Sequence, residues 1–132
     1  MVQLTPQVLE LLRRPDSNKI LSTINADGTP HSVVCGSFEM SDDGCIGVGK
    51  VWFRTTGENL MRDPRAEFLV WLGKYAYSIQ VELSEKSRRS EDVDSINEQL
   101  DKMQMKARSV WFFTPLSVMD QGITSTTGQQ IV

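Results

Sequence analysis

Alternation of apolar and polar residues predicts that this chain is built mainly from short β-strands. From Ser78 to Ser84 every second residue is apolar, and Arg65–Leu72 places its apolar residues on one face in the same way. Turn sequences containing glycine, Asn25–Gly28 and Asp42–Gly44, separate the earlier segments. Four further strands are therefore expected at Ile20–Ile24, His31–Met40, Cys45–Val48 and Val110–Met119.

A different periodicity predicts three helices. Thr5 and Pro6 are suited to the N-cap and first position of a short helix that Pro15 ends. A second short helix is expected over Thr55–Asp63. Apolar residues spaced three and four apart predict a long helix over Ser90–Lys106, residues 90–106, with one apolar stripe formed by Val93, Ile96, Leu100 and Met103.

Few helices and about six hairpin-linked strands indicate a mainly β fold, either a sandwich or a closed barrel. The 132 residues fit one domain, 1–132, and no internal repeat is present. Residues 122–132 form a polar tail rich in Ser, Thr, Gly and Gln, which could be ordered or flexible. The charged run Glu85–Asp94 is expected to be a solvated loop that leads into the long helix.

Charge and composition exclude several classes of function. A formal net charge of −3 and a pI near 5.1 argue against nucleic acid and against an anionic membrane surface as partners. No apolar run approaches the roughly 18 residues of a membrane span, and the N-terminus lacks a signal-peptide core. We therefore expect a cytoplasmic protein in which Cys35 and Cys45 are reduced thiols. With a single histidine, no common zinc site is expected.

The segment most suggestive of chemistry is Cys45–Pro64, in which a strand runs through a glycine-containing loop to a helix start. The first turn of a helix offers unpaired N–H groups to an anion, and Arg54, Thr55 and Thr56 add a cation and two hydroxyls. Glycines 47 and 49 would allow a flat ring to approach the backbone. Thr55 and Glu58 are equally consistent with a capping box that needs no ligand, so spacing alone leaves both interpretations open.

The order of these motifs resembles the FMN-binding split-barrel family, which is related to pyridoxamine phosphate oxidase, and most closely its small FMN-binding proteins. The resemblance covers roughly Ile20–Gln121 and rests on the runs ILSTINADGTPHSVVCGSFEM and CIGVGKVWFRTTGENLMRDPRAEFLV. Its most specific part combines Thr56, Asn59-Leu60 and Asp63-Pro64. No single motif is diagnostic, because the order and spacing carry the resemblance.

This resemblance implies a six-stranded split Greek-key β-barrel that forms a homodimer with FMN at the interface. The segment Val34, Cys35, Gly36 and Ser37 would pass beside the isoalloxazine ring, and Val48, Gly49, Lys50 and Val51 would meet its polar edge. Arg54, Thr55 and Thr56 would hold the phosphate, with Asn59 close behind them. The second subunit would close the other side of the ring through Trp111 or through the stretch after Met119. The cofactor site is therefore expected in and around Gly49–Asn59.

Departures from the family pattern refine this expectation. Several small relatives carry Lys-Thr at the positions of Thr55-Thr56, so the basic role would pass to Arg54 or Lys50. The tail after Gly122 contains neither Trp nor Arg, which argues against oxidation of pyridoxamine phosphate. Lys50 could also stabilise reduced flavin, or could be an ordinary exposed lysine.

Other chemistry-bearing side chains have simpler explanations. Cys35 and His31 are too far apart along a strand for a catalytic pair, so Cys35 is expected to be a packing residue. Aromatic residues such as Trp52 and Phe53 are expected in the core or at an interface.

The predicted function is that of an FMN-binding redox flavoprotein, either an electron-transfer protein or an FMN-dependent oxidoreductase whose redox partner is unknown. No catalytic side chain stands out. One alternative is a deazaflavin or haem in the same barrel, although haem would depend on His31 as the available histidine. Another alternative is a cofactor-free interaction or sensor module.

Overall fold

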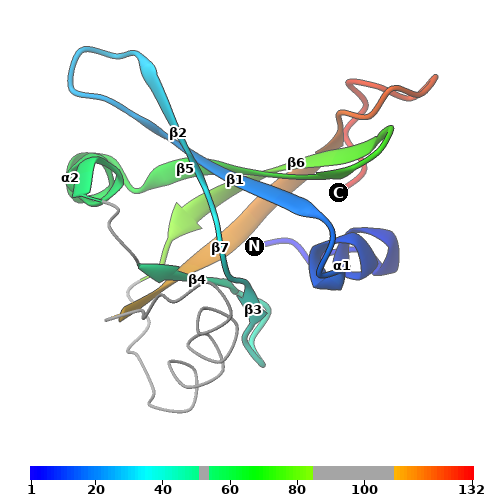
Figure 1. Ribbon diagram of the computed structural model, residues 1–132, viewed down its shortest axis with the longest axis horizontal. Coiled ribbons are helices and arrows are strands. Elements are labelled where there is room, and N and C mark those ends of the chain that lie inside the picture. Colours follow the sequence, from blue (N-terminus) through cyan, green and yellow to red (C-terminus); the bar gives the residue numbers. More distant parts are fainter. Residues whose placement is uncertain (51–53, 85–108) are drawn as a thin grey trace.

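The computed structural model describes residues 1–50, 54–84 and 109–132 (Figure 1). Two helices and seven strands lie within this part of the chain. The helices are α1 (Pro6–Arg13) and α2 (Arg54–Arg62). The strands are β1 (Asn18–Ile24), β2 (Pro30–Val34), β3 (Glu39–Met40), β4 (Ile46–Lys50), β5 (Arg65–Leu72), β6 (Tyr75–Leu83) and β7 (Ser109–Asp120).

The strands form one antiparallel sheet in the order β2-β1-β5-β6-β7-β4-β3. The sheet curls into a half-barrel, with β2, β1, β5 and β6 on one side and β7, β4 and β3 on the other (Figure 1). The two edge strands, β2 and β3, are consecutive in the chain, so residues 35–38 cross directly from one edge to the other. The segment Val34–Ser37 therefore lies between the two open edges of the sheet.

The expectation of six strands is wrong, because the predicted strand His31–Met40 is two strands. Pairing of β2 with β1 ends at Val34, although the Cys35 N–H still donates to the Lys19 carbonyl at 3.0 Å. The chain then leaves the β1 edge at Gly36, a residue that weakens strand pairing. It pairs again only at Glu39, with β4. The mainly β class is confirmed, whereas the expected Greek-key topology is not confirmed by the observed strand order.

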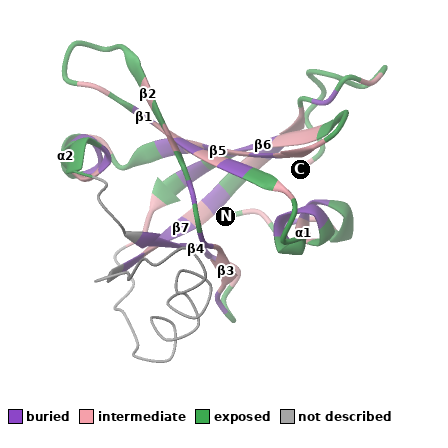
Figure 2. Ribbon diagram, in the orientation of Figure 1, coloured by how far each residue is buried: buried purple, intermediate pink, exposed green. Residues whose placement is uncertain are grey.

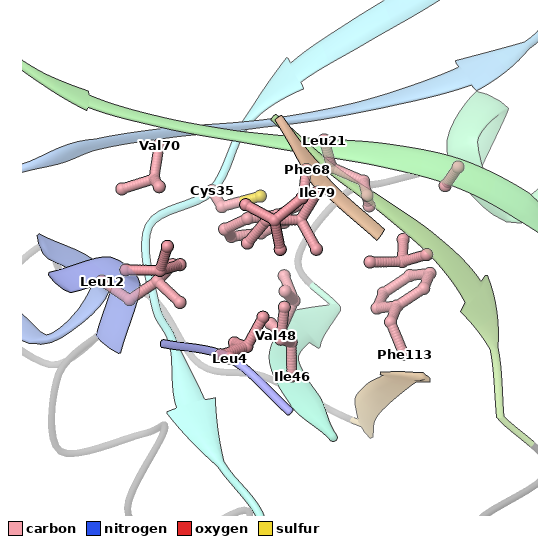
Figure 3. Packing of buried hydrophobic residues seen from close by; sticks show 14 of the residues in the cluster. Leu4, Leu12, Leu21, Cys35, Ile46, Val48, Phe68, Val70, Ile79 and Phe113 are labelled. Atoms are coloured by element: carbon pink, nitrogen blue, oxygen red, sulfur yellow. The ribbon is translucent and has the colours of Figure 1, made fainter. Parts of the chain in front are cut away.

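The core lies inside the curl of the sheet and is closed at one end by α1. Thr5 precedes α1 and Pro6 begins it, as predicted, and Val8, Leu11 and Leu12 on its inner face are buried. Figure 2 shows buried residues along the central strands, and Figure 3 shows Leu12 and Cys35 directed toward the same interior as Phe68 and Ile79. Helix α1 contacts strand β5 in this arrangement.

The tail 122–132 folds back along β7. The Asp120 N–H donates to the carbonyl of Gln129, and the Val118 N–H donates to that of Val132. The Asp120 carboxylate accepts hydrogen bonds from the hydroxyls of Thr124 and Thr126, which lowers its pKa. The predicted helix over residues 90–106 lies outside the described residues. Neither of the two helices described is long and apolar enough to cross a membrane.

Candidate functional site

Helix α2 is held against the β1–β2 hairpin by a buried amide. The side chain of Asn59 is 3% exposed. Its Nδ2 donates to Thr23 Oγ1 and to Asn25 Oδ1, both at 3.0 Å. Arg62 Nη2 donates to Asn59 Oδ1 (3.0 Å) and to the carbonyl of Ile24 (2.6 Å). Because buried amides need most of their hydrogen bonds satisfied, this network fixes the position of α2 and its N-terminal turn.

The first turn of α2 contains the three residues expected to bind phosphate. Arg54 and Thr55 are exposed, whereas Thr56 is 1% exposed. The Oγ1 atom of Thr56 is buried and has no hydrogen-bond partner among the described residues. A buried hydroxyl without a partner costs about 1–3 kcal/mol, so this position carries unused hydrogen-bonding capacity.

The capping-box interpretation does not match the helix boundary. Helix α2 begins at Arg54, so Thr55 lies inside the first turn instead of at the N-cap. The Glu58 carboxylate accepts from Arg54 Nε at 3.4 Å, and both side chains are largely exposed. Exposed ion pairs of this kind contribute at most about 1 kcal/mol, so Arg54 can exchange Glu58 for another anion at little cost.

A hollow of about 330 Å³ adjoins α2 and the ends of β6 and β7. Two predicted site residues, Arg54 and Trp111, both line it, together with Leu83 and the helix residues Gly57 and Met61. Trp111 lies directly opposite Val48 in the pairing of β4 with β7. The structure therefore brings Trp111 and Arg54 of the same chain to one hollow.

The segment expected beside the flavin ring lines a second and larger space. Val34, Cys35, Gly36 and Ser37 border a groove of about 800 Å³ that extends to the end of α1. We call this space the α1 groove. The Gly49 N–H donates to Ser37 Oγ at 3.2 Å, which ties this segment to the end of β4. The two predicted halves of the site are thus linked through β4, while their cavities remain separate.

Individual residues of these segments differ in what they can offer a ligand. Burial raises the pKa of the Cys35 thiol to about 12, so it is a neutral packing group. The side chain of Val48 is fully buried in the core, which leaves its backbone for any ligand. Val34 is 72% exposed on the outer face of the sheet. The side chain of Lys50 and all of Val51 lie outside the described residues.

Sequence reasoning missed the contributions of Lys19 and Arg62. Lys19 points into the barrel at the edge of the α1 groove and is 8% exposed. Arg62 joins α2 to the hairpin through Asn59. The available signal for Arg62 was its spacing of three residues from Asn59, which puts both on one helix face. For Lys19 no signal existed, because a strand of seven residues does not reveal which face is inward.

Comparison with known proteins places the fold. No family model matches the chain, and no curated protein matches it. Among solved structures, an FMN-binding protein from Syntrophomonas wolfei subsp. wolfei matches with a TM-score of 0.71 and 20% identity, covering 89% of this chain and 88% of that one. A proposed pyridoxamine 5′-phosphate oxidase from Lactobacillus delbrueckii matches with a TM-score of 0.64 and 19% identity, covering 89% and 93%.

An F420 reductase also matches, with a TM-score of 0.64 and 15% identity over 83% of this chain and 93% of that one. These likenesses cover most of both chains in each case, so the shared architecture is that of the whole domain. The chain has the split-barrel fold of these proteins. The resemblance predicted from the sequence is confirmed at the level of the fold.

Proposed function

We propose that this protein is an FMN-binding redox flavoprotein whose phosphate site is the first turn of α2. The observation that carries the proposal is the buried, unpartnered hydroxyl of Thr56 within that turn. Helix N-termini present free N–H groups and a partial positive charge, which suit a phosphate. The exposed Arg54 supplies the full charge, and the similarity in fold to an FMN-binding protein supports FMN as the phosphorylated ligand.

We assign the remaining parts of the cofactor to the two backbone segments that the Gly49–Ser37 hydrogen bond joins. The isoalloxazine ring lies along Val34–Ser37, with the backbone of Val48–Val51 at its polar edge and Trp111 at its side. When bound, the flavin accepts and returns electrons or hydride. The protein binds and orients it, and the Ser37–Gly49 hydrogen bond keeps the two backbone segments at a fixed separation.

The phosphate assignment is tested by titrating FMN and riboflavin into flavin-free protein and following flavin fluorescence. Arg54→Ala is expected to weaken FMN at least tenfold while leaving riboflavin within about twofold, because the lost partner is the phosphate. Thr56→Val keeps the side-chain shape and removes the unpartnered hydroxyl. It should weaken FMN but leave the free protein equally or more stable, by up to about 1 kcal/mol.

Lys74→Ala is the control for Arg54→Ala, because Lys74 is an exposed cation on the β5–β6 turn, and it should leave FMN binding unchanged. Equal weakening of FMN and riboflavin by Arg54→Ala would refute the phosphate assignment. A purified protein that is colourless and ignores FMN would refute the proposed cofactor. Uptake of deazaflavin or haem in the same titration would select the alternative ligand, and the similarity in fold to an F420 reductase is the reason to include deazaflavin.

We further propose that the working unit is a homodimer with the flavin at its interface. An apolar row crosses the outer face of the sheet, since Val34 lies opposite Ile20 and Ile20 lies opposite Leu69. Val34 and Ile24 are 72% and 43% exposed, respectively, and clustered exposed apolar residues favour association. Val34→Lys is expected to produce a monomer in analytical ultracentrifugation, and a monomeric wild type would contradict the proposal.

A further inference from the structure

Lys19 is an ammonium group placed where the strand pattern puts core residues. Alternate residues of β1 face inward, and these are Lys19, Leu21 and Thr23, all buried. Lys19 is 8% exposed, which is rare for a lysine unless its charge is paired. Its burial lowers the pKa of the ammonium despite opposing contributions from Cys35 and Asp16. Position and desolvation therefore both disfavour a charge here.

The protein provides little compensation for this charge. Lys19 Nζ donates one hydrogen bond, to Ser17 Oγ at 2.8 Å, and lies 5.9 Å from the centroid of the Phe38 ring. Among the described residues it forms no salt bridge. Asp16, the nearest carboxylate in sequence, is engaged by Arg14 at 2.9 Å. An ammonium has three N–H donors, so two of them are available to a ligand.

The α1 groove gives that ligand a place. Its volume of about 800 Å³ is within the usual range of small-molecule sites. Beside Ser17 and Lys19, its walls include the apolar side chains of Leu12, Phe38 and Met40. Lys19 is the buried cation of this lining, and the other charged lining residues are Arg13, Arg14 and Glu39. A buried cation beside apolar walls fits an amphiphilic molecule.

Neighbouring charges limit how much negative charge the ligand can carry. Glu39 also lines the groove, and its carboxylate would repel a second anionic group. Arg13 and Arg14 are exposed, and Arg14 forms an ion pair with Asp16 at 2.9 Å. Because Lys19 is the buried cation among the lining residues, the interior of the groove suits a single negative charge.

We propose that the α1 groove binds a small organic acid, with one carboxylate on an apolar or aromatic body. The carboxylate accepts hydrogen bonds from the two remaining N–H groups of the Lys19 ammonium, and the apolar body packs on Phe38 and Leu12. Ser17 orients the ammonium, because its hydroxyl accepts from Lys19 and donates to the Arg14 carbonyl (2.9 Å). Because Val34–Ser37 borders both this groove and the proposed flavin ring, a bound acid lies beside the ring. The acid is expected to bind whether or not flavin is present. Its role as a substrate rests on the proposed function.

Calorimetric titration of the full-length protein tests the site, first without flavin and then loaded with FMN. The probes are benzoate, cyclohexanecarboxylate, the neutral isostere benzamide, and inorganic phosphate. We expect both acids to bind one per chain in both forms. Benzamide should bind at least tenfold more weakly than benzoate, and phosphate should not bind in the groove of FMN-loaded protein.

Three variants separate recognition from stability. Lys19→Met keeps the length of the side chain and removes the charge, and it should weaken benzoate at least tenfold while raising the melting temperature. Lys19→Arg should retain benzoate within a few fold. Lys74→Met is the matched control, since Lys74 is exposed on the β5–β6 turn, and it should leave benzoate binding unchanged.

The proposal is overturned by absence of benzoate binding, by equal binding of benzoate and benzamide, or by unchanged binding to Lys19→Met. Lower stability of Lys19→Met with benzoate binding intact would show that the ammonium is purely structural. Mutual displacement of benzoate and FMN would show that the groove belongs to the flavin site and is not a separate one. Benzoate binding without FMN uptake would sustain this site and defeat the proposed cofactor.

Discussion

Breaking the contact between Asn59 and Thr23 tests whether α2 is held in place by hydrogen bonds. Both side chains are almost fully buried, at 3% and 1% exposed, and they are joined at 3.0 Å. Asn59→Ala removes three side-chain hydrogen bonds, each contributing about 1 kcal/mol, and leaves the Thr23 hydroxyl buried without that partner. Recovered side-chain entropy offsets about 1 kcal/mol of the loss. We expect a net destabilisation of about 2–4 kcal/mol.

A second substitution, Thr23→Val, completes a double-mutant cycle. Thr23→Val removes the acceptor with little change of shape, and it should cost about 1–2 kcal/mol because Asn59 retains its bond to Asn25. In the double variant neither partner is left buried alone, so its cost should fall below the sum of the single costs by about 1–2 kcal/mol. Urea unfolding at equilibrium measures all four proteins.

The result that would refute the reasoning is additivity. If the double variant costs the sum of the single variants to within about 0.5 kcal/mol, the two side chains do not depend on each other. Asn18→Ala is the control, because Asn18 is exposed and its amide contact with the Trp71 carbonyl is long at 3.5 Å. It should change stability by no more than about 0.5 kcal/mol.

Three further changes test other parts of the fold. The hydrogen bond from Arg65 lowers the pKa of Asp63 to about 2. The contribution of ionised Asp63 to stability is therefore present above about pH 4 and is lost as the pH falls toward 2. The difference in melting temperature between wild type and Asp63→Asn should shrink over that window, and a constant difference would contradict this linkage. Gly122→Ala would place a Cβ 2.5 Å from the Lys74 carbonyl oxygen, so it should cost about 1–3 kcal/mol in urea unfolding, unless the tail does not dock as described. Phe68→Ala empties the centre of the core and should cost about 3–5 kcal/mol; a loss under about 1 kcal/mol would mean that the core is not closed there.

Strands and short helices were predictable because their signals are local. Strand β5 coincides with the predicted Arg65–Leu72, since alternation and Pro64 define it within a few residues. The division of His31–Met40 into two strands was not predictable from the same pattern, because apolar residues continue through the segment at Val33, Cys35 and Phe38. What ends β2 is the geometry of the barrel, in which residues 35–38 must pass from one sheet edge to the other.

The candidate phosphate site was predicted by residue type but not by environment. Sequence placed Arg54, Thr55 and Thr56 together at a helix start, which the structure reproduces. The sequence did not indicate which of the two threonines is buried. In a short helix, tertiary packing decides which face points inward. The amide of Asn59 fixes the inward face of α2, and the same orientation buries Thr56 and exposes Thr55.

Strand β1 shows why the exceptions to the pattern are the informative positions. Its outward face carries Ile20 and Ile24, while its inward face carries Lys19 and Thr23 around Leu21. Asn18 and Ser22 are also on the outward face, so hydrophobicity alone does not decide which face of β1 is inward. Each inward polar residue has a specific task, since Thr23 binds Asn59 beneath α2 and Lys19 borders the α1 groove. Sequences depart from simple patterning mainly where function requires it, so the inward polar residues of β1 support the ligand proposed at Lys19.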